Sequence, residues 1–159
     1  MLEEMIILIL MTFIPFLELR ASIPYGILVL HMNWFFVFVV CVIANIVLGP
    51  VLYLFLDKFI HLFLKINAVG KCYNFYIKRT QKKIKKYVDK YGLLGVSIFI
   101  GIPLPGSGVY SAALGSYLLG LEFRKFIMAT ILGVLIAGIL VAAIVLSGSA
   151  AFGFFIKVI

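Results

Sequence analysis

The hydrophobic pattern divides the chain into two long uninterrupted apolar segments and two that prolines interrupt. The uninterrupted segments are residues 34–56 and 126–147. A helix that crosses the ~30 Å hydrocarbon core of a bilayer takes about 20 apolar residues. Each of these segments is therefore predicted to form one transmembrane helix.

The two interrupted segments cannot be plain spans. Residues 5–32 contain Pro15 and Pro24, and residues 91–121 would be about 46 Å long as one helix. The second contains Gly101-Ile-Pro-Leu-Pro-Gly-Ser-Gly108, and its prolines remove backbone donors while its glycines loosen the chain. Because each half is too short to cross alone, we predict re-entrant helical hairpins over 5–32 and 93–119. Four spanning helices, two of them kinked at proline, are the alternative.

The order of hairpin and span occurs twice, so the predicted fold is an all-α integral membrane protein with an inverted repeat. One cytoplasmic connection after a single span gives the two halves opposite orientations, as in many transporters. The chain then forms a single membrane domain, 1–159. Its parts are a first repeat (5–56), a basic cytoplasmic segment (57–92), a second repeat (93–147) and a short C-terminal tail (148–159).

Composition and charge support this picture. Of 159 residues, 65% are hydrophobic, and the mean hydropathy is +1.23, which excludes a water-soluble globule. Residues 57–90 carry ten Lys/Arg against Asp57 and Asp89, which accounts for the whole net charge of +8. By the positive-inside rule this segment is cytoplasmic in a multi-pass protein of the cell membrane. Its apolar positions recur at helical spacing, which predicts an amphipathic helix on anionic lipid rather than a nucleic-acid site.

Glu18 and Arg20 are the only charges between Met5 and Leu56. A charge at membrane depth costs roughly 2.5–3.5 kcal/mol, so the pair is a candidate functional site. On a helix the two side chains would lie about 200° apart, whereas in an extended tip they point to one side, which the prolines favour. Arg20 could bind a phosphate or carboxylate, and Glu18 could hold Arg20 or carry a proton. A structural pair that closes the hairpin is the alternative.

The second tip offers neutral donors: Ser107, Tyr110 and the amides around Gly106 and Gly108. A half-helix that begins near Ser107 would attract an anionic head group to its N-terminus. Asn45 could line the same cavity, although an interhelical hydrogen bond is the favoured role. The remaining candidate binding positions of the two tips are Ser22, Pro24, Gly26, Pro103 and Pro105.

No chemistry of an enzyme is indicated. The sequence shows no Ser/His/Asp set, nucleotide-binding loop or metal-ligand cluster, and His31 and His61 are isolated. Cys41 and Cys72 fall in a span and in the cytoplasmic segment, which excludes a disulfide framework. We therefore expect no cofactor and no metal.

The strings Glu18-Leu-Arg-Ala-Ser-Ile-Pro-Tyr-Gly26 and Pro103-Leu-Pro-Gly-Ser-Gly108 resemble the prokaryotic small multi-drug export family, over about residues 12–145. That family is grouped with the DedA superfamily of membrane proteins. The resemblance implies two re-entrant hairpins in an inverted repeat, and movement of phospholipids or polyprenyl phosphates between leaflets. The family's own name implies drug efflux. For the cytoplasmic-side carboxylate and arginine expected of DedA proteins, the candidates here are Glu122 and Arg124.

Three functions are left open by these observations. The first is a transporter or scramblase-like protein for an amphiphile with an anionic head group, with proton coupling through Glu18 as one version. The second is a proton-coupled exporter of small drug-like compounds, with Glu18 as the substrate counter-ion. The third is a membrane scaffold without transport. The expected partners are membrane lipids, the substrate, protons and a second copy in a homodimer, because 159 residues enclose little by themselves.

Overall fold

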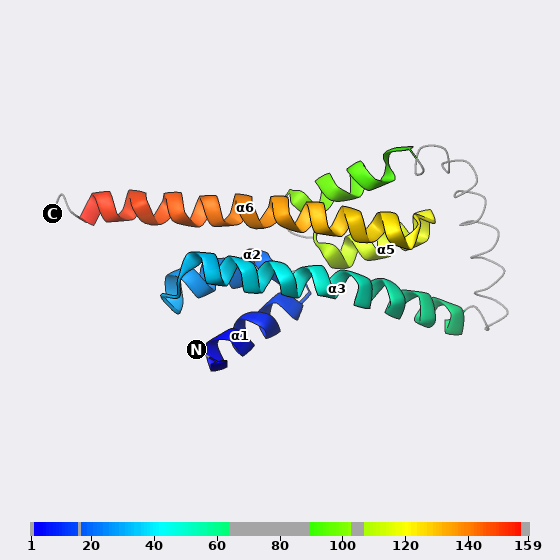
Figure 1. Ribbon diagram of the computed structural model, residues 1–159, viewed down its shortest axis with the longest axis horizontal. Helices are drawn as coiled ribbons and strands as arrows, with labels where there is room; N and C mark the ends of the chain where they lie inside the picture. The colour runs from blue at the N-terminus through cyan, green and yellow to red at the C-terminus, as the bar shows by residue number, and fades with distance from the viewer. Residues whose placement is uncertain (1, 16, 64–89, 103–106, 157–159) are drawn as a thin grey trace.

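The computed structural model describes residues 2–15, 17–63, 90–102 and 107–156, and this part of the chain is entirely helical (Figure 1). The predicted basic helix at 64–89 therefore lies outside the described residues, as do Pro103, Pro105 and Gly106. In chain order the helices are α1 (Leu2–Phe13), α2 (Glu18–Pro24), the π-helix η1 (Tyr25–Val29), α3 (Trp34–Phe63), the helix Lys90–Gly101, α5 (Val109–Leu119) and α6 (Phe123–Ile156).

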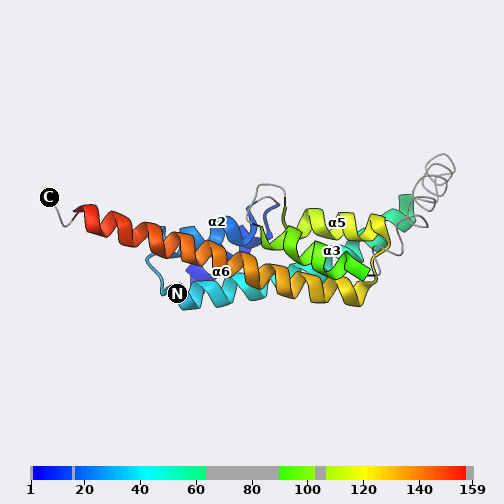
Figure 2. The ribbon, with the colours of Figure 1, turned by 90° about the horizontal axis from the view of Figure 1, so that it is seen from above.

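Helices α3 and α6 form the long axis of the molecule and lie side by side in both views (Figures 1 and 2). Their stretches Trp34–Phe59 and Phe123–Gly148 are long and apolar enough to cross a membrane, with mean hydropathies of 2.7 and 2.9. The two predicted long apolar helices are therefore confirmed. Both helices run past their predicted ends because charged residues such as Asp57 and Arg124 end an apolar stretch without ending a helix.

The first interrupted segment breaks where the sequence predicts. Helix α1 ends at Phe13, and the next residue, Ile14, precedes Pro15, which disfavours helical backbone. The chain then returns along α1 as α2 and η1 (Figure 1). Pro24 has no N–H for the carbonyl four residues earlier, and the helix continues through the wider turns of η1.

One prediction about this segment is wrong. Residues Glu18–Pro24 are α-helical, so Glu18 and Arg20 do not lie in an extended tip. The tip is confined to the few residues between α1 and α2. Glu18, at the start of α2, still has a positive φ of 47°, and the helix continues from there to Pro24.

The second interrupted segment consists of the helix Lys90–Gly101 and α5, which returns beside it (Figure 1). Helix α5 starts after Gly108 and ends at Gly120, whose φ of 73° lets the chain turn into α6. The two broken segments enter the bundle from opposite ends, and their breaks meet near its middle (Figures 1 and 2). This meeting point holds the candidate site.

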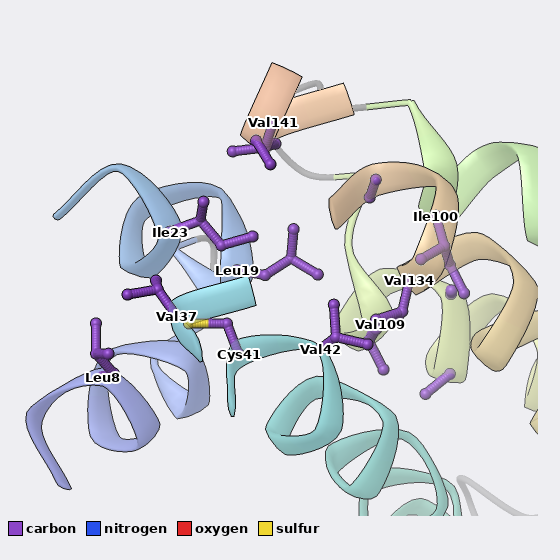
Figure 3. Close-up of a cluster of buried hydrophobic side chains, with 14 of the residues drawn as sticks. Leu8, Leu19, Ile23, Val37, Cys41, Val42, Ile100, Val109, Val134 and Val141 are labelled. Carbon is purple, nitrogen blue, oxygen red and sulfur yellow. The ribbon is translucent and has the colours of Figure 1, made fainter. Parts of the chain in front are cut away.

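A single apolar core joins these elements (Figure 3). Its members come from all the helices of the bundle, and they include Leu8, Leu19, Val42, Val109 and Val134. Many large apolar side chains instead cover the outside, for example Leu10, Phe55 and Ile144, each more than half exposed. A surface of this kind fits hydrocarbon rather than water.

Candidate functional site

Glu18 binds the start of α5. Its carboxylate is 2% exposed and accepts the backbone N–H groups of Val109, at 3.2 Å, and Tyr110, at 3.4 Å. These N–H groups have no helical partner, and the helix dipole favours an anion there. Gly108 permits the approach, because a Cβ at this position would lie 2.1 Å from the Glu18 Oε1 atom. The predicted anion site at the start of this half-helix therefore exists, and Glu18 of the same chain occupies it.

Arg20 binds the other side of the same break. Its Nη2 group donates to the carbonyls of Ile100 and Ile102, both at 3.2 Å, and to the carbonyl of Ser107 at 2.7 Å. It also donates to the Ser107 hydroxyl at 3.1 Å. The last carbonyls of a helix lack helical partners and carry partial negative charge. Arg20 thus complements the end of the helix Lys90–Gly101, as Glu18 complements the start of α5.

Within the described part of the chain, Glu18 and Arg20 bond to the second hairpin and not to one another. Of the roles considered, a direct pair of the two side chains is therefore not the one seen. Their separation follows from the helical backbone, on which residues two apart point about 200° apart. The charges hold two hairpins together instead of closing one.

Two further residues of the second tip join this junction. The Tyr110 hydroxyl donates to the carbonyl of Phe13 at the end of α1. The Ser107 hydroxyl donates to the carbonyl of Ile102 at 2.6 Å and so links the two sides of the second break. The sequence correctly grouped Ser107, Gly108 and Tyr110 with the two charges. It named the backbone amides of this tip as anion donors, but it did not predict that Glu18 would accept them or that Arg20 would bind carbonyl groups.

The other predicted site residues lie elsewhere. Ser22 bonds to the Thr12 hydroxyl at 2.8 Å, between α1 and α2. A Cβ on Gly26 would lie 2.7 Å from Val37 Cγ1, so this glycine allows close packing against α3. Pro24 marks the transition into η1. Glu122 and Arg124 are exposed at the start of α6 and take no part in the junction.

Asn45 has a more unusual environment. It is completely buried in α3, yet among the described residues neither its amide oxygen nor its amide nitrogen has a hydrogen-bond partner. The favoured interhelical hydrogen bond is therefore wrong. The preceding turn of α3 carries Cys41, whose thiol contacts the Ser22 hydroxyl of α2. Because α2 and α3 run in opposite directions (Figure 1), one turn further along α3 brings Asn45 to the level of Glu18.

A cavity of about 400 Å³ opens beside the junction. Glu18, Arg20, Tyr110 and Ser111 give it a polar end. Its other walls are apolar side chains from the first break, α3 and α5, namely Pro15, Leu52, Phe55, Leu56 and Leu114. A ligand in this cavity would meet charged groups on one side and hydrocarbon on the other.

At the polar end, Arg20 keeps unused donors beside the partly used acceptors of Glu18. Both carboxylate oxygens of Glu18 accept an N–H group. In contrast, the Nε and Nη1 atoms of Arg20 are buried without a partner in the described structure. Within the same residues, no three side chains of His, Cys, Asp or Glu are placed to hold a metal ion.

Two long apolar helices around two broken ones, with an apolar outer surface, define a helical membrane protein. The sequence model of the family described as "putative small multi-drug export protein" matches residues 18–140, and the chain belongs to this family. The matched region begins at Glu18, directly after the first break, and includes the second break. Neither the comparison with curated proteins nor that with solved structures gives a match.

Proposed function

We propose that this protein is a transporter that moves an amphiphile with an anionic head group, such as a phospholipid or polyprenyl phosphate, through the membrane. The family's description supports export rather than enzymatic chemistry and leaves the substrate open. The observation that carries the proposal is the pair of unpartnered Arg20 donors beside a cavity with apolar walls.

The free donors favour an anion over a cation. A guanidinium binds phosphate or carboxylate through parallel N–H groups, and here Nε and Nη1 are unused. A cationic compound would need acceptors, and each Glu18 oxygen already accepts one N–H, from Val109 or Tyr110, so it would share the carboxylate with the start of α5. Because Nε and Nη1 are buried, an anionic head group would reach them after a shift of the side chains that cover them, while Nη2 keeps its contacts to the second hairpin.

The apolar walls of the cavity suit the tail of such a substrate. Phe55 lines the cavity and is 61% exposed on the outer surface. The cavity wall therefore continues into the surface that would face lipid. A substrate could keep its tail in hydrocarbon while its head group reaches Arg20.

This function requires the breaks to lie at membrane depth, which is the re-entrant arrangement of an inverted repeat. It is supported by two short helical pairs that meet halfway along α3 and α6 (Figure 1), and by backbone groups at the breaks that bond within the protein. The positive charge of residues 57–90 favours a cytoplasmic location of residues 57–92, in the cell membrane.

Two observations favour other functions. The family's description fits a proton-coupled exporter of small compounds, in which Glu18 would leave α5 to bind a cation. The match between each charge and a helix end fits a scaffold, in which the charges only stabilise the breaks.

Lipid transfer in reconstituted vesicles distinguishes the three. Arg20→Gln should abolish transfer of a fluorescent anionic lipid, and Arg124→Gln, which removes an exposed cation on α6, should not. Glu18→Gln should mainly change the pH dependence. If the protein is instead a cation exporter, Glu18→Gln should abolish transport and Arg20→Gln should have the smaller effect. If both variants stay folded in a thermal melt and transfer lipid like the parent, the charges are structural and the proposal is wrong.

A further inference from the structure

A second cavity, of about 320 Å³, lies on the other flank of α5, between α5 and the helix Lys90–Gly101. We name it the Ser116 groove. Its lining includes Gly92, Gly95, Phe99, Gly115 and Ser116. Except for its serines the groove is apolar, and no charged side chain lines it.

The glycines of the groove face empty space. A Cβ built on Gly95 or on Gly115 would have no heavy atom within 4 Å. Glycines between other helices are closely packed: a Cβ on Gly133 would lie 2.7 Å from the Ser97 carbonyl oxygen. The protein therefore leaves room for a neighbour between these two short helices.

Ser116 indicates what kind of neighbour is missing. It is 1% exposed, it lines the groove, and its hydroxyl has no hydrogen-bond partner among the described residues. An unpaired buried hydroxyl is unfavourable, so an occupant that brings an acceptor would be bound preferentially. A pure hydrocarbon would leave this hydroxyl unsatisfied.

The groove and the cavity at Arg20 are neighbours along α5, because Ser111 lines both. Ser116 lies seven residues beyond Val109, about 10 Å along α5 from the Glu18 contact. A lipid with its head group at the junction would place the beginning of its chains at this distance. In an ester-linked lipid, that position carries a carbonyl oxygen.

We infer that the Ser116 groove binds an acyl chain of an ester-linked phospholipid, with the Ser116 hydroxyl donating to the ester carbonyl. The inference rests on the proposed function for the location of the head group. It narrows the substrate class, because a polyprenyl phosphate has no ester carbonyl.

The test is photo-crosslinking in vesicles with a phospholipid that carries a diazirine in its acyl chain, followed by mapping of the adducts by mass spectrometry. Adducts should concentrate on residues 92–99 and 111–119. Gly95→Leu and Gly115→Leu, whose Cβ atoms would meet no atom within 4 Å, should fill the groove and remove them. Gly148→Leu is the matched control, because a Cβ there also meets no atom within 4 Å. Ether-linked competitors should displace the probe about three- to tenfold less well than ester-linked ones, and Ser116→Ala should remove this difference.

Several results would overturn the inference. One is equal labelling of the outer surface of α6 at Ile139 and Ile144; another is groove labelling that survives Gly115→Leu. A dimer of the parent that Gly115→Leu dissociates would mean that a second copy fills the groove. Arg20→Gln separates this inference from the proposed function. Suppose that the Arg20→Gln variant still transfers anionic lipid like the parent and is still labelled in the groove with a preference for ester-linked lipid. The proposal for the head group would then be wrong, and the acyl-chain site would remain supported.

Discussion

At the scale of single residues, the junction tolerates two buried charges because each meets a helix end of opposite partial charge. Glu18 meets the N–H groups that begin α5, and Arg20 meets the carbonyls that end the helix Lys90–Gly101. Both interactions satisfy groups that the break itself leaves without partners. Among the described residues, buried side-chain atoms without a partner belong to Arg20, Asn45, Ser116 and Thr130, and Arg20 is the one of these that lines the cavity at the junction.

Asn45→Leu should make the protein more stable. Removing an unpaired buried amide for an apolar side chain of similar size should raise the free energy of unfolding by about 1–3 kcal/mol. The same substitution at Asn33 should lower it by about 1 kcal/mol, because Asn33 caps α3 by accepting the N–H of Phe35 at 2.9 Å.

Denaturation in detergent micelles measures both changes, and lipid transfer measured on the same variants adds the functional part. Asn45→Leu should slow transfer if its amide takes part in the passage of the head group. A loss of stability in this variant would mean that Asn45 does have a partner in the membrane-embedded protein.

The sequence predicted those residues of the site that are charged or that lie next to a break in the backbone. Glu18, Arg20, Ser107, Gly108 and Tyr110 were identified because they are polar or flexible in apolar surroundings. Their hydrogen-bond partners are backbone groups, which no side-chain pattern reports. Ser22 and Gly26 were assigned to the site because they are near Glu18 in sequence. A helix carries them away from the break to contacts with Thr12 and Val37.

At the scale of the elements, proline positions and apolar length predicted the long helices and the breaks. They did not predict the extent of α2, because a helix of seven residues between two prolines depends on its packing against α1 and α3. The π-helix η1 was missed for a similar reason. Pro24 removes one backbone donor, and the neighbouring helices determine how the following turn adapts.

Gly108→Ala tests the contact between α2 and α5. The added methyl would lie 2.1 Å from the Glu18 Oε1 atom and should displace the carboxylate from the start of α5. We expect the free energy of unfolding to fall by about 1–3 kcal/mol. Gly115→Ala is the control on the same helix, because its methyl meets no atom within 4 Å. Equal thermal stability of the two variants would show that Glu18 does not occupy this position.

At the scale of the whole molecule, the apolar surface and the two long helices indicate a membrane protein, and we propose that the charge distribution orients it. The end of α3 and the start of α6 lie at one end of the bundle, and the start of α1 and the turn before α3 lie at the other (Figure 1). Because residues 57–90 carry a net charge of +8, we assign the first of these ends to the cytoplasm.

Single-cysteine labelling in a background without Cys41 and Cys72 tests this orientation and the depth of the breaks together. Cysteines at Lys58 and Glu122 should react with an impermeant maleimide only from the cytoplasmic side, and cysteines at Glu3 and His31 only from outside; all four positions are exposed. Ser107→Cys should react from neither side, because Ser107 is buried at the junction.

The labelling of Glu3 and His31 distinguishes the two folds of the first broken segment. A re-entrant hairpin leaves both positions on the same side of the membrane, whereas a single kinked span puts them on opposite sides. Labelling of these two positions from opposite sides would show that the first broken segment crosses the membrane, and the re-entrant arrangement would be wrong.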